Sequence, residues 1–255
     1  MPVRPSLLLI PSFTELEWRI RPALEEWAEV ASFDTPGVGN SLLPAGLDVD
    51  SVDRGELLAR WRELAVERAL EEVERQNWNR FVVVADSLGH PTAVGVTRAR
   101  PGDVTGLALG HAALSHAVDG ERAPMSGVVW EAMSQLAHQG SDTFVRYGIA
   151  QMTQGGIDEE TARRMVDRFP DMDLVSAVVH AVGEDPEPIG GDVAALDLPL
   201  LLAKHEGCIG HTDEGFEDMV AAFPEAQTVI CPETCASSPT FAKALRGFAE
   251  RRTAG

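Results

Sequence analysis

The chain has 255 residues, of which 44% are hydrophobic and 24% are charged, a balance that suits one sizeable globular domain or a domain with an insertion. Its 21 basic and 40 acidic residues give a formal net charge of −19. Nucleic acid and anionic membranes would both repel such a surface, so the charge argues against these two partners. We expect a small-molecule substrate or ligand, and the sequence leaves open whether the protein is a monomer or a homodimer.

Targeting segments and cofactor motifs are missing from the sequence. The apolar run at 7–10 is too short for the core of a signal peptide, and no apolar stretch reaches the length of a membrane span. Three cysteines are too few for a disulfide framework, so we expect a cytoplasmic protein. Because the usual zinc, phosphate-binding and dinucleotide-binding motifs are absent, we expect no metal and no other cofactor.

The first half of the chain alternates short apolar runs with longer amphipathic patterns. Apolar runs rich in β-branched residues are typical of buried strands, and apolar residues spaced three and four apart are typical of helices. Such alternation predicts a parallel sheet that is covered by helices on both faces. We expect strands at 7–10, 30–33, 81–84 and 104–109, and helices at 16–27, 53–78 and 89–100.

The alternation stops at about residue 115 and resumes at about residue 197. We interpret 115–196 as a helical cap that is inserted before the penultimate strand, while 1–114 and 197–255 form the core. The predicted fold class is therefore α/β, a doubly wound, mostly parallel sheet of about six strands with a helical cap. We expect cap helices at 126–138, 142–152, 158–169 and 171–182, later strands at 198–203 and 228–231, and later helices at 214–223 and 239–251.

The most informative motif directly follows the strand that begins at Phe81. A sharp turn from strand to helix needs small residues two positions before and two positions after its apex, because larger side chains would clash with neighbouring backbone. Ala85 and Gly89 meet this need and place Ser87 at the apex, with its hydroxyl facing a pocket. Ser87 is therefore the candidate nucleophile.

Together with this turn, the order of elements resembles the α/β-hydrolase superfamily over essentially the whole chain. Residues 33–41 are similar to the family's aromatic-Asp-x-Pro-Gly-x-Gly-x-Ser loop, and Trp18 falls where a tryptophan often follows the first strand. Ser12 and Phe13 fall where the family usually has Gly-aromatic. The resemblance implies a ligand pocket between the serine turn and the cap, with the backbone amides of Phe13 and Leu88 as donors to the oxyanion.

The same resemblance implies an acid after the penultimate strand and a histidine after the last strand, and this chain has neither. Cys208 and Cys235 stand at about these two positions. A serine hydroxyl without a base is a poor nucleophile near neutral pH. The candidate bases are His111, after the strand next to that of Ser87, and His205 and His211, after the penultimate strand.

Other features of the site keep more than one interpretation. Asp86 either faces solvent or caps the next helix, and His90 packs where that helix meets the sheet. Glu233 is a candidate to orient His205 or His211. Cys208 and Cys235 are either two semi-buried thiols or, if they approach each other, a redox pair or a thiol nucleophile.

Three hypotheses about function follow. The leading one is an α/β-hydrolase-type enzyme that acts on a small, largely apolar ester, thioester or lactone through Ser87, with an atypical and incomplete triad. The second keeps the pocket but predicts a cofactor-free lyase, cyclase or isomerase that forms no acyl-enzyme. The third is a degenerate hydrolase that binds a small molecule or a protein and turns nothing over.

Overall fold

A computed structural model of the chain describes its sheet and the helices that cover it. The described residues are 4–41, 43, 53–111, 145–146, 149–150, 152–153, 158–168, 174–175, 177–178, 190–207 and 213–253. The predicted cap helix at 126–138 lies outside them, and so do most residues of those at 142–152 and 171–182. None of the described helices is both long and apolar enough to span a membrane.

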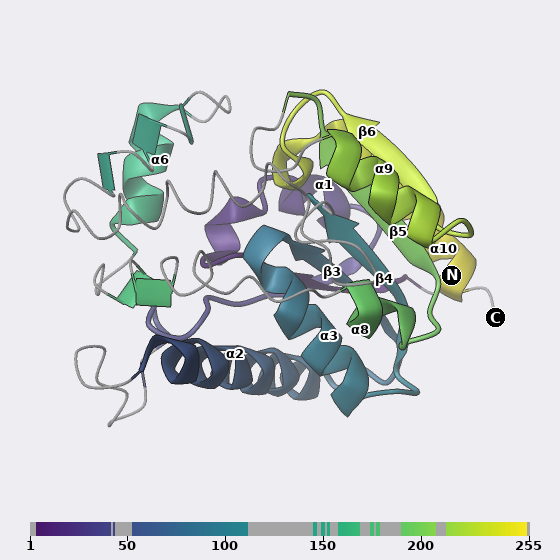
Figure 1. The fold of residues 1–255 in the computed structure, drawn as a ribbon, viewed down its shortest axis with the longest axis horizontal. Coiled ribbons are helices and arrows are strands. Elements are labelled where there is room, and N and C mark those ends of the chain that lie inside the picture. The colour runs from purple at the N-terminus through teal and green to yellow at the C-terminus, as the bar shows by residue number, and fades with distance from the viewer. Residues whose placement is uncertain are drawn as a thin grey trace.

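Six strands form one sheet in the order β2-β1-β3-β4-β5-β6, and all five pairings are parallel. The chain lays β2 on one side of β1 and then crosses back to lay β3 on the other side, which makes the sheet doubly wound. From β3 onward, β4, β5 and β6 are added in chain order on that side (Figure 1). The predicted α/β fold class with a doubly wound sheet of about six strands is therefore confirmed. The strands are β1 Ser6–Ile10, β2 Glu29–Ser32, β3 Phe81–Asp86, β4 Val104–Gly110, β5 Leu200–His205 and β6 Gln227–Cys231.

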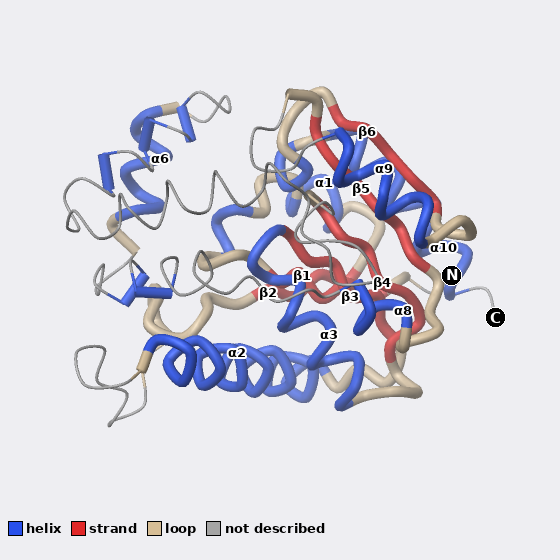
Figure 2. Tube along the Cα trace, viewed as in Figure 1, coloured by secondary structure: helices blue, strands red, loops and turns tan. Residues whose placement is uncertain are grey.

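Helices cover both faces of the sheet, as Figure 2 shows. One face is covered by α2 (Arg54–Gln76), α3 (His90–Ala99), α8 (Gly190–Ala194) and α9 (Asp213–Ala222). The other face is covered by α1 (Arg21–Glu25) and α10 (Pro239–Thr253).

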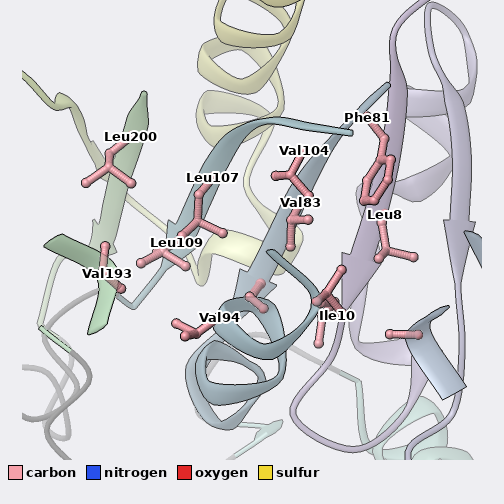
Figure 3. Packing of buried hydrophobic residues seen from close by; sticks show 14 of the residues in the cluster. Leu8, Ile10, Phe81, Val83, Val94, Val104, Leu107, Leu109, Val193 and Leu200 are labelled. Carbon is pink, nitrogen blue, oxygen red and sulfur yellow. The ribbon is translucent and has the colours of Figure 1, made fainter. Parts of the chain in front are cut away.

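The central strands are buried on both sides, which explains why their sequences are continuously apolar. Leu8 and Val83 point into the core beneath α2 and α3, where Figure 3 shows them, while Leu9 and Val84 point into the core beneath α10. All four side chains are fully buried. Burial of this kind, at about 25 cal/mol per Å² of apolar surface, is the main force that holds the sheet between its helices.

The predicted helix at 16–27 is wrong. The structure instead has a 3-10 turn, η1, at Glu15–Glu17 and then the short helix α1. Pro22 lies in the first turn of α1, where a missing N–H costs nothing, whereas within a longer helix it would remove a hydrogen bond and clash with the preceding turn. The apolar spacing over 16–27 therefore belongs to two short elements.

The segment between β4 and β5 is tied to the core near β2. Its described helix α6 spans Glu159–Val166. Just after α6, Arg168 forms an ion pair with Asp34, and its backbone carbonyl accepts a hydrogen bond from the Gly39 amide at 2.6 Å. The loop that resembles the hydrolase family therefore also anchors the inserted segment. The cap boundaries at 115 and 196 stay a prediction.

Gly89 sets how closely α3 approaches β1. A Cβ atom at this position would lie 2.8 Å from the carbonyl oxygen of Ile10 and 2.9 Å from that of Pro11. Both are backbone atoms at the end of a central strand, so neither can give way as a flexible side chain would. The turn after β3 and the loop after β1 are therefore held in direct contact.

We predict that Gly89→Ala lowers the free energy of unfolding by about 1–3 kcal/mol, the usual cost of forcing atoms into a filled site. Urea denaturation would measure the loss. Gly102→Ala is the matched control, because a Cβ at Gly102 meets nothing within 4 Å and should change stability by less than about 0.5 kcal/mol. Equal effects of the two substitutions would contradict the close packing inferred for Gly89.

Candidate active site

The carboxyl ends of β1 and β3 lie side by side at the point where the strand order reverses. Ligands of open α/β sheets bind outside the carboxyl ends of the strands at such a point. The loop after β1 and the turn after β3 flank it, and the Ser12 hydroxyl joins them by donating to the carbonyl of Asp86 at 3.3 Å. This edge of the sheet is therefore the candidate active site.

Ser87 lies at the turn that leads from β3 into α3. Its backbone has φ of 46°, in the left-handed region that a residue with a side chain rarely adopts. The short 3-10 turn η2 (Ser87–Gly89) follows, and α3 begins at the next residue. A left-handed non-glycine residue costs roughly 1–2 kcal/mol and persists only where its surroundings enforce it, often at functional sites. Here the close packing at Gly89 supplies that constraint.

Three side chains from neighbouring strands form a hydrogen-bonded chain beside Ser87. Asp86 is the last residue of β3, His111 directly follows β4, and His205 ends β5. The Asp86 Oδ1 and His111 Nδ1 atoms are 2.6 Å apart, and the His111 Nε2 and His205 Nδ1 atoms are also 2.6 Å apart. Asp86 and His111 are buried, while His205 is partly exposed. We call these three residues the Asp-His-His chain.

The positions of the protons in the Asp-His-His chain follow from which atoms can donate a hydrogen bond and which can accept one. An ionised carboxylate only accepts, so Nδ1 of His111 carries a proton and donates it to Asp86. When both imidazoles are neutral, Nε2 of His111 is an acceptor, and Nδ1 of His205 donates to it. The outer nitrogen of His205, Nε2, is then left with a lone pair. The chain therefore presents a base at its exposed end.

The pKa values of the two histidines move in opposite directions. Burial disfavours the charged form of His111, but the Asp86 carboxylate outweighs burial and raises the pKa of His111 above 6.5. Burial and then the charge on His111 lower the pKa of His205 to about 4. Burial would raise the pKa of Asp86, yet the His111 charge lowers it. When the pair takes up one additional proton, His111 therefore holds it next to Asp86, and His205 stays neutral.

Two buried thiols, those of Cys231 and Cys235, lie near the Asp-His-His chain. Cys231 ends β6 and Cys235 begins the 3-10 turn η3 (Cys235–Ser237), and both are free. A hydrogen bond from the Cys235 thiol lowers the pKa of Cys231, while the same bond and burial raise the pKa of Cys235. Neither side chain is exposed, which separates them from reactive cysteines, which are partly open to solvent. We interpret them as the packed floor of the site.

One group of side chains has the composition of a metal site. Single donor atoms of Asp86, His111 and Cys235 all lie within 4.8 Å of one another. However, the 2.6 Å hydrogen bond between Asp86 and His111 brings these two donors closer together than two ligands bound to one metal ion would lie. The geometry fits a proton between them, and we assign the group to proton transfer.

The loop after β1 is held from two sides. The Phe13 carbonyl accepts from both the amide and the hydroxyl of Thr35, at 2.8 and 2.9 Å, and the Phe13 ring lies 5.9 Å from the ring of Trp61 in α2. The Asp34 carboxylate accepts from the Thr14 hydroxyl at 2.9 Å. The loop at 33–41 therefore fixes the loop that carries the predicted oxyanion donor.

The Glu17 carboxylate accepts a hydrogen bond from the predicted oxyanion donor, the amide of Phe13. The Glu17 side chain accepts hydrogen bonds from the amides of Ser12, Phe13 and Thr14 at 2.8, 2.9 and 3.0 Å. Burial raises the pKa of Glu17 to about 7, against the lowering effect of the three amides, and Asp86 adds a smaller increase. The predicted oxyanion donor of Phe13 thus already has an acceptor in this structure.

The structure brings together some of the predicted site residues. Asp86 and His205 are the last residues of their strands, and the following loops or turns contain Ser12, Phe13, Ser87, Leu88, His111 and Cys235, whereas Cys208 and His211 lie outside the described residues. The roles predicted for these residues stay predictions. His90 packs as expected, buried with its Nε2 atom 2.8 Å from the Gly110 carbonyl oxygen.

One interpretation of a site residue is wrong. Asp86 neither faces solvent nor caps α3, because it is 8% exposed and its carboxylate binds His111. Glu233 accepts from the Ser238 hydroxyl at 3.0 Å while His205 bonds to His111, so Glu233 does not orient His205. Its pairing with His211, which lies outside the described residues, stays a prediction. Cys208 also lies outside them, and the Cys235 thiol hydrogen-bonds to that of Cys231.

Two site residues were missed from the sequence. The first, Cys231, was treated only as the end of a strand. The second, Glu17, stands three residues after Thr14, and Thr-x-x-Glu is the signature of a capping box. This signature would have found the Glu17 contact with the Thr14 amide, although not those with Ser12 and Phe13.

Comparison with solved structures identifies the fold. The 2-hydroxy-6-oxo-6-phenylhexa-2,4-dienoate hydrolase of a Rhodococcus strain superposes with a TM-score of 0.71 at 15% identity, over 98% of this chain and 91% of that one. A hydrolase from Oleispira antarctica gives 0.70 at 15% identity, over 97% and 92%. The enol-lactonase of Burkholderia xenovorans gives 0.67 at 16% identity, over 99% and 92%.

These proteins share one architecture, and the chain therefore has the α/β-hydrolase fold. No protein-family model and no curated protein matches the sequence. Since the identities to the solved structures are low, they establish the fold, and the chemistry has to be argued from the site.

We predict that the two histidines of the Asp-His-His chain titrate in two separate steps. His111 should give the upper step, above 6.5, and His205 the lower step, at about 4. In Asp86→Asn the upper step should fall, because burial then acts on His111 without a nearby carboxylate. NMR titration of the imidazole signals would measure both steps. Asp103→Asn, at the opposite end of β4, should leave them unchanged, and an unmoved upper step in Asp86→Asn would refute the pairing.

Proposed function

We propose that this protein hydrolyses a small, largely apolar ester, thioester or lactone, with Ser87 as the nucleophile and the Asp-His-His chain as the base. The observation that carries the proposal is the pair of 2.6 Å hydrogen bonds that links Asp86, His111 and His205 next to the strained Ser87 turn. Solved structures with this fold include an enol-lactonase, an esterase and a thioesterase domain, which supports an acyl substrate.

The Asp-His-His chain supplies the two groups that are missing after the last two strands, namely a histidine base and an acid that supports it. In the proposed reaction, the Ser87 hydroxyl loses its proton to Nε2 of His205 while its oxygen attacks the substrate carbonyl. The proton on Nδ1 of His205 moves to Nε2 of His111, and the resulting cation is stabilised by Asp86. When the tetrahedral intermediate collapses, the bond from the carbonyl carbon to the leaving group breaks, and the leaving group takes the proton from Nε2 of His205 as the other proton returns to Nδ1. Water then cleaves the acyl-enzyme by the same steps. In this proposal, the Ser87 hydroxyl reaches Nε2 of His205 directly or through one water molecule.

Asp86 is better suited to this task than the sequence suggested. A carboxylate that faced the reacting carbonyl would disfavour a developing oxyanion. Here the carboxylate is buried and directed at His111, so its charge acts on the imidazole. Because Asp86 directly precedes Ser87 in the sequence, one turn supplies both the nucleophile and the acid that supports the base.

A second candidate is a cofactor-free lyase, cyclase or isomerase that uses His205 without an acyl-enzyme. The observation that favours it is the Glu17 carboxylate on the Phe13 amide, because acyl transfer needs that amide for the oxyanion. The two candidates differ in their need for Ser87. Turnover that survives Ser87→Ala but not His205→Gln would favour this second function.

We predict that a fluorophosphonate labels the wild-type protein at Ser87 and that Ser87→Ala abolishes the labelling. His205→Gln should slow labelling by about 10²–10⁴-fold, the usual contribution of a general base. Labelling should also slow as the pH falls through the raised pKa of His111, because His111 is then already protonated and the Asp-His-His chain cannot accept the proton of Ser87. Intact-protein mass spectrometry against time would give the rates.

Ser6→Ala is the matched control, since Ser6 begins β1 at the opposite end of the sheet. It should label at the wild-type rate. Wild-type protein that stays unlabelled between pH 6 and 9 would exclude a serine hydrolase. A ligand that raises the melting temperature without any turnover would then support a binding protein.

A further inference from the structure

The loop after β1 binds a carboxylate that belongs to the chain itself. Oε1 of Glu17 accepts from the amides of Phe13 and Thr14, and Oε2 accepts from the amide of Ser12. Three successive amides that converge on one carboxylate form an anion-binding nest. The second of these amides, that of Phe13, is the one that the family resemblance assigns to the oxyanion.

Helix capping explains only part of this arrangement. In the capping box of η1, Glu17 reaches back to the Thr14 amide, while the Thr14 hydroxyl accepts from the Leu16 amide at 3.4 Å. The bonds to Ser12 and Phe13 lie outside the box and contribute nothing to the cap. They direct the carboxylate toward the edge of the sheet where β1 and β3 end.

Ser12 connects the Glu17 carboxylate to the turn that carries Ser87. The Ser12 amide donates to Glu17, and the Ser12 hydroxyl donates to the carbonyl of Asp86, the residue before Ser87. Glu17 as a residue is partly exposed, while its carboxyl group is surrounded by protein. The Glu17 carboxylate is thus bound to the loop that contacts the Ser87 turn.

We infer that Glu17 gates acyl transfer: its carboxylate occupies the Phe13 amide and has to leave this amide before an oxyanion forms at Ser87. The inference rests on the proposed function. An amide N–H donates one strong hydrogen bond, so it cannot serve a carboxylate and an oxyanion at once. A fixed negative charge beside a developing one also opposes the reaction.

The environment of Glu17 makes its release feasible. Burial raises the pKa of its carboxyl to about 7, and the charge of Asp86 acts in the same direction. A neutral carboxyl accepts hydrogen bonds about half as strongly as an ionised one. Near neutral pH the three amides are therefore held less firmly than by an ordinary carboxylate.

The test compares Glu17→Ala with wild type by the rate of fluorophosphonate labelling. Removing the carboxylate frees the Phe13 amide, and one oxyanion donor is worth on the order of 10²–10³ in rate. We expect Glu17→Ala to label about 10-fold faster or more, and Glu17→Gln to fall between the two because its amide is neutral but still accepts. The double variant Ser87→Ala/Glu17→Ala should not be labelled.

Glu15→Ala is the matched control. Glu15 lies on the same 3-10 turn but pairs with Arg21 and Arg168 and not with the three amides. The Glu15→Ala substitution removes one negative charge near the three amides, while Glu17 stays bound to them. Labelling at the wild-type rate is expected, and an acceleration equal to that of Glu17→Ala would show a general effect of charge and overturn the gate.

Added formate gives a second readout. In Glu17→Ala it should fill the vacated nest, raise the melting temperature and return labelling toward the wild-type rate, with no such effect in wild type. If wild type and a folded Glu17→Ala label equally fast, the inference fails while the proposed function stands. If the folded variant loses labelling, Glu17 is itself a catalytic group and the gate is refuted. If neither protein is labelled, the proposed function fails and takes the gate with it.

Discussion

The contact between the turn after β3 and the end of β1 is the constraint on which the rest of the site depends. Gly89 lets the backbone of the turn approach the carbonyls of Ile10 and Pro11, and this approach keeps Ser87 in its left-handed conformation. The same contact aligns two loops from adjacent strands. The relative position of the serine and the loop amides therefore depends on this backbone contact together with the buried side chains that hold the loop after β1.

The site also shows how a chain can lack the usual acid and histidine positions and still assemble an acid-supported base. Parallel strands end at one edge of a sheet, so residues at the ends of β3, β4 and β5 meet there although they are far apart in the sequence. Asp86, His111 and His205 are these three residues. Burial makes their pairing strong, since a buried carboxylate without a partner costs several kcal/mol.

The fold could be predicted from the sequence, and the site only in part. Strand runs such as 81–84 are apolar on both faces, and that pattern alone requires a sheet covered on both sides. His111 and His205 were found because each directly follows a strand. The role of Asp86 was missed because the rotamer that directs its carboxylate toward His111 depends on the neighbouring strand, and no local pattern encodes it. The helix at 16–27 failed because Pro22 outweighed an apolar spacing that two short elements share.

Two carboxylates near Ser87 have opposite environments, and this difference separates their roles. Asp86 faces an imidazole, which keeps it ionised, so it can support positive charge on His111 through the whole reaction. Glu17 faces amides and, more distantly, Asp86, and burial makes its ionised form less favourable. Where the environments of two titratable groups push their pKa values apart, one group serves as a fixed charge and the other changes state. By this reasoning Asp86 belongs to the permanent machinery of the site, and Glu17 is the group whose charge and position are free to respond when a ligand arrives.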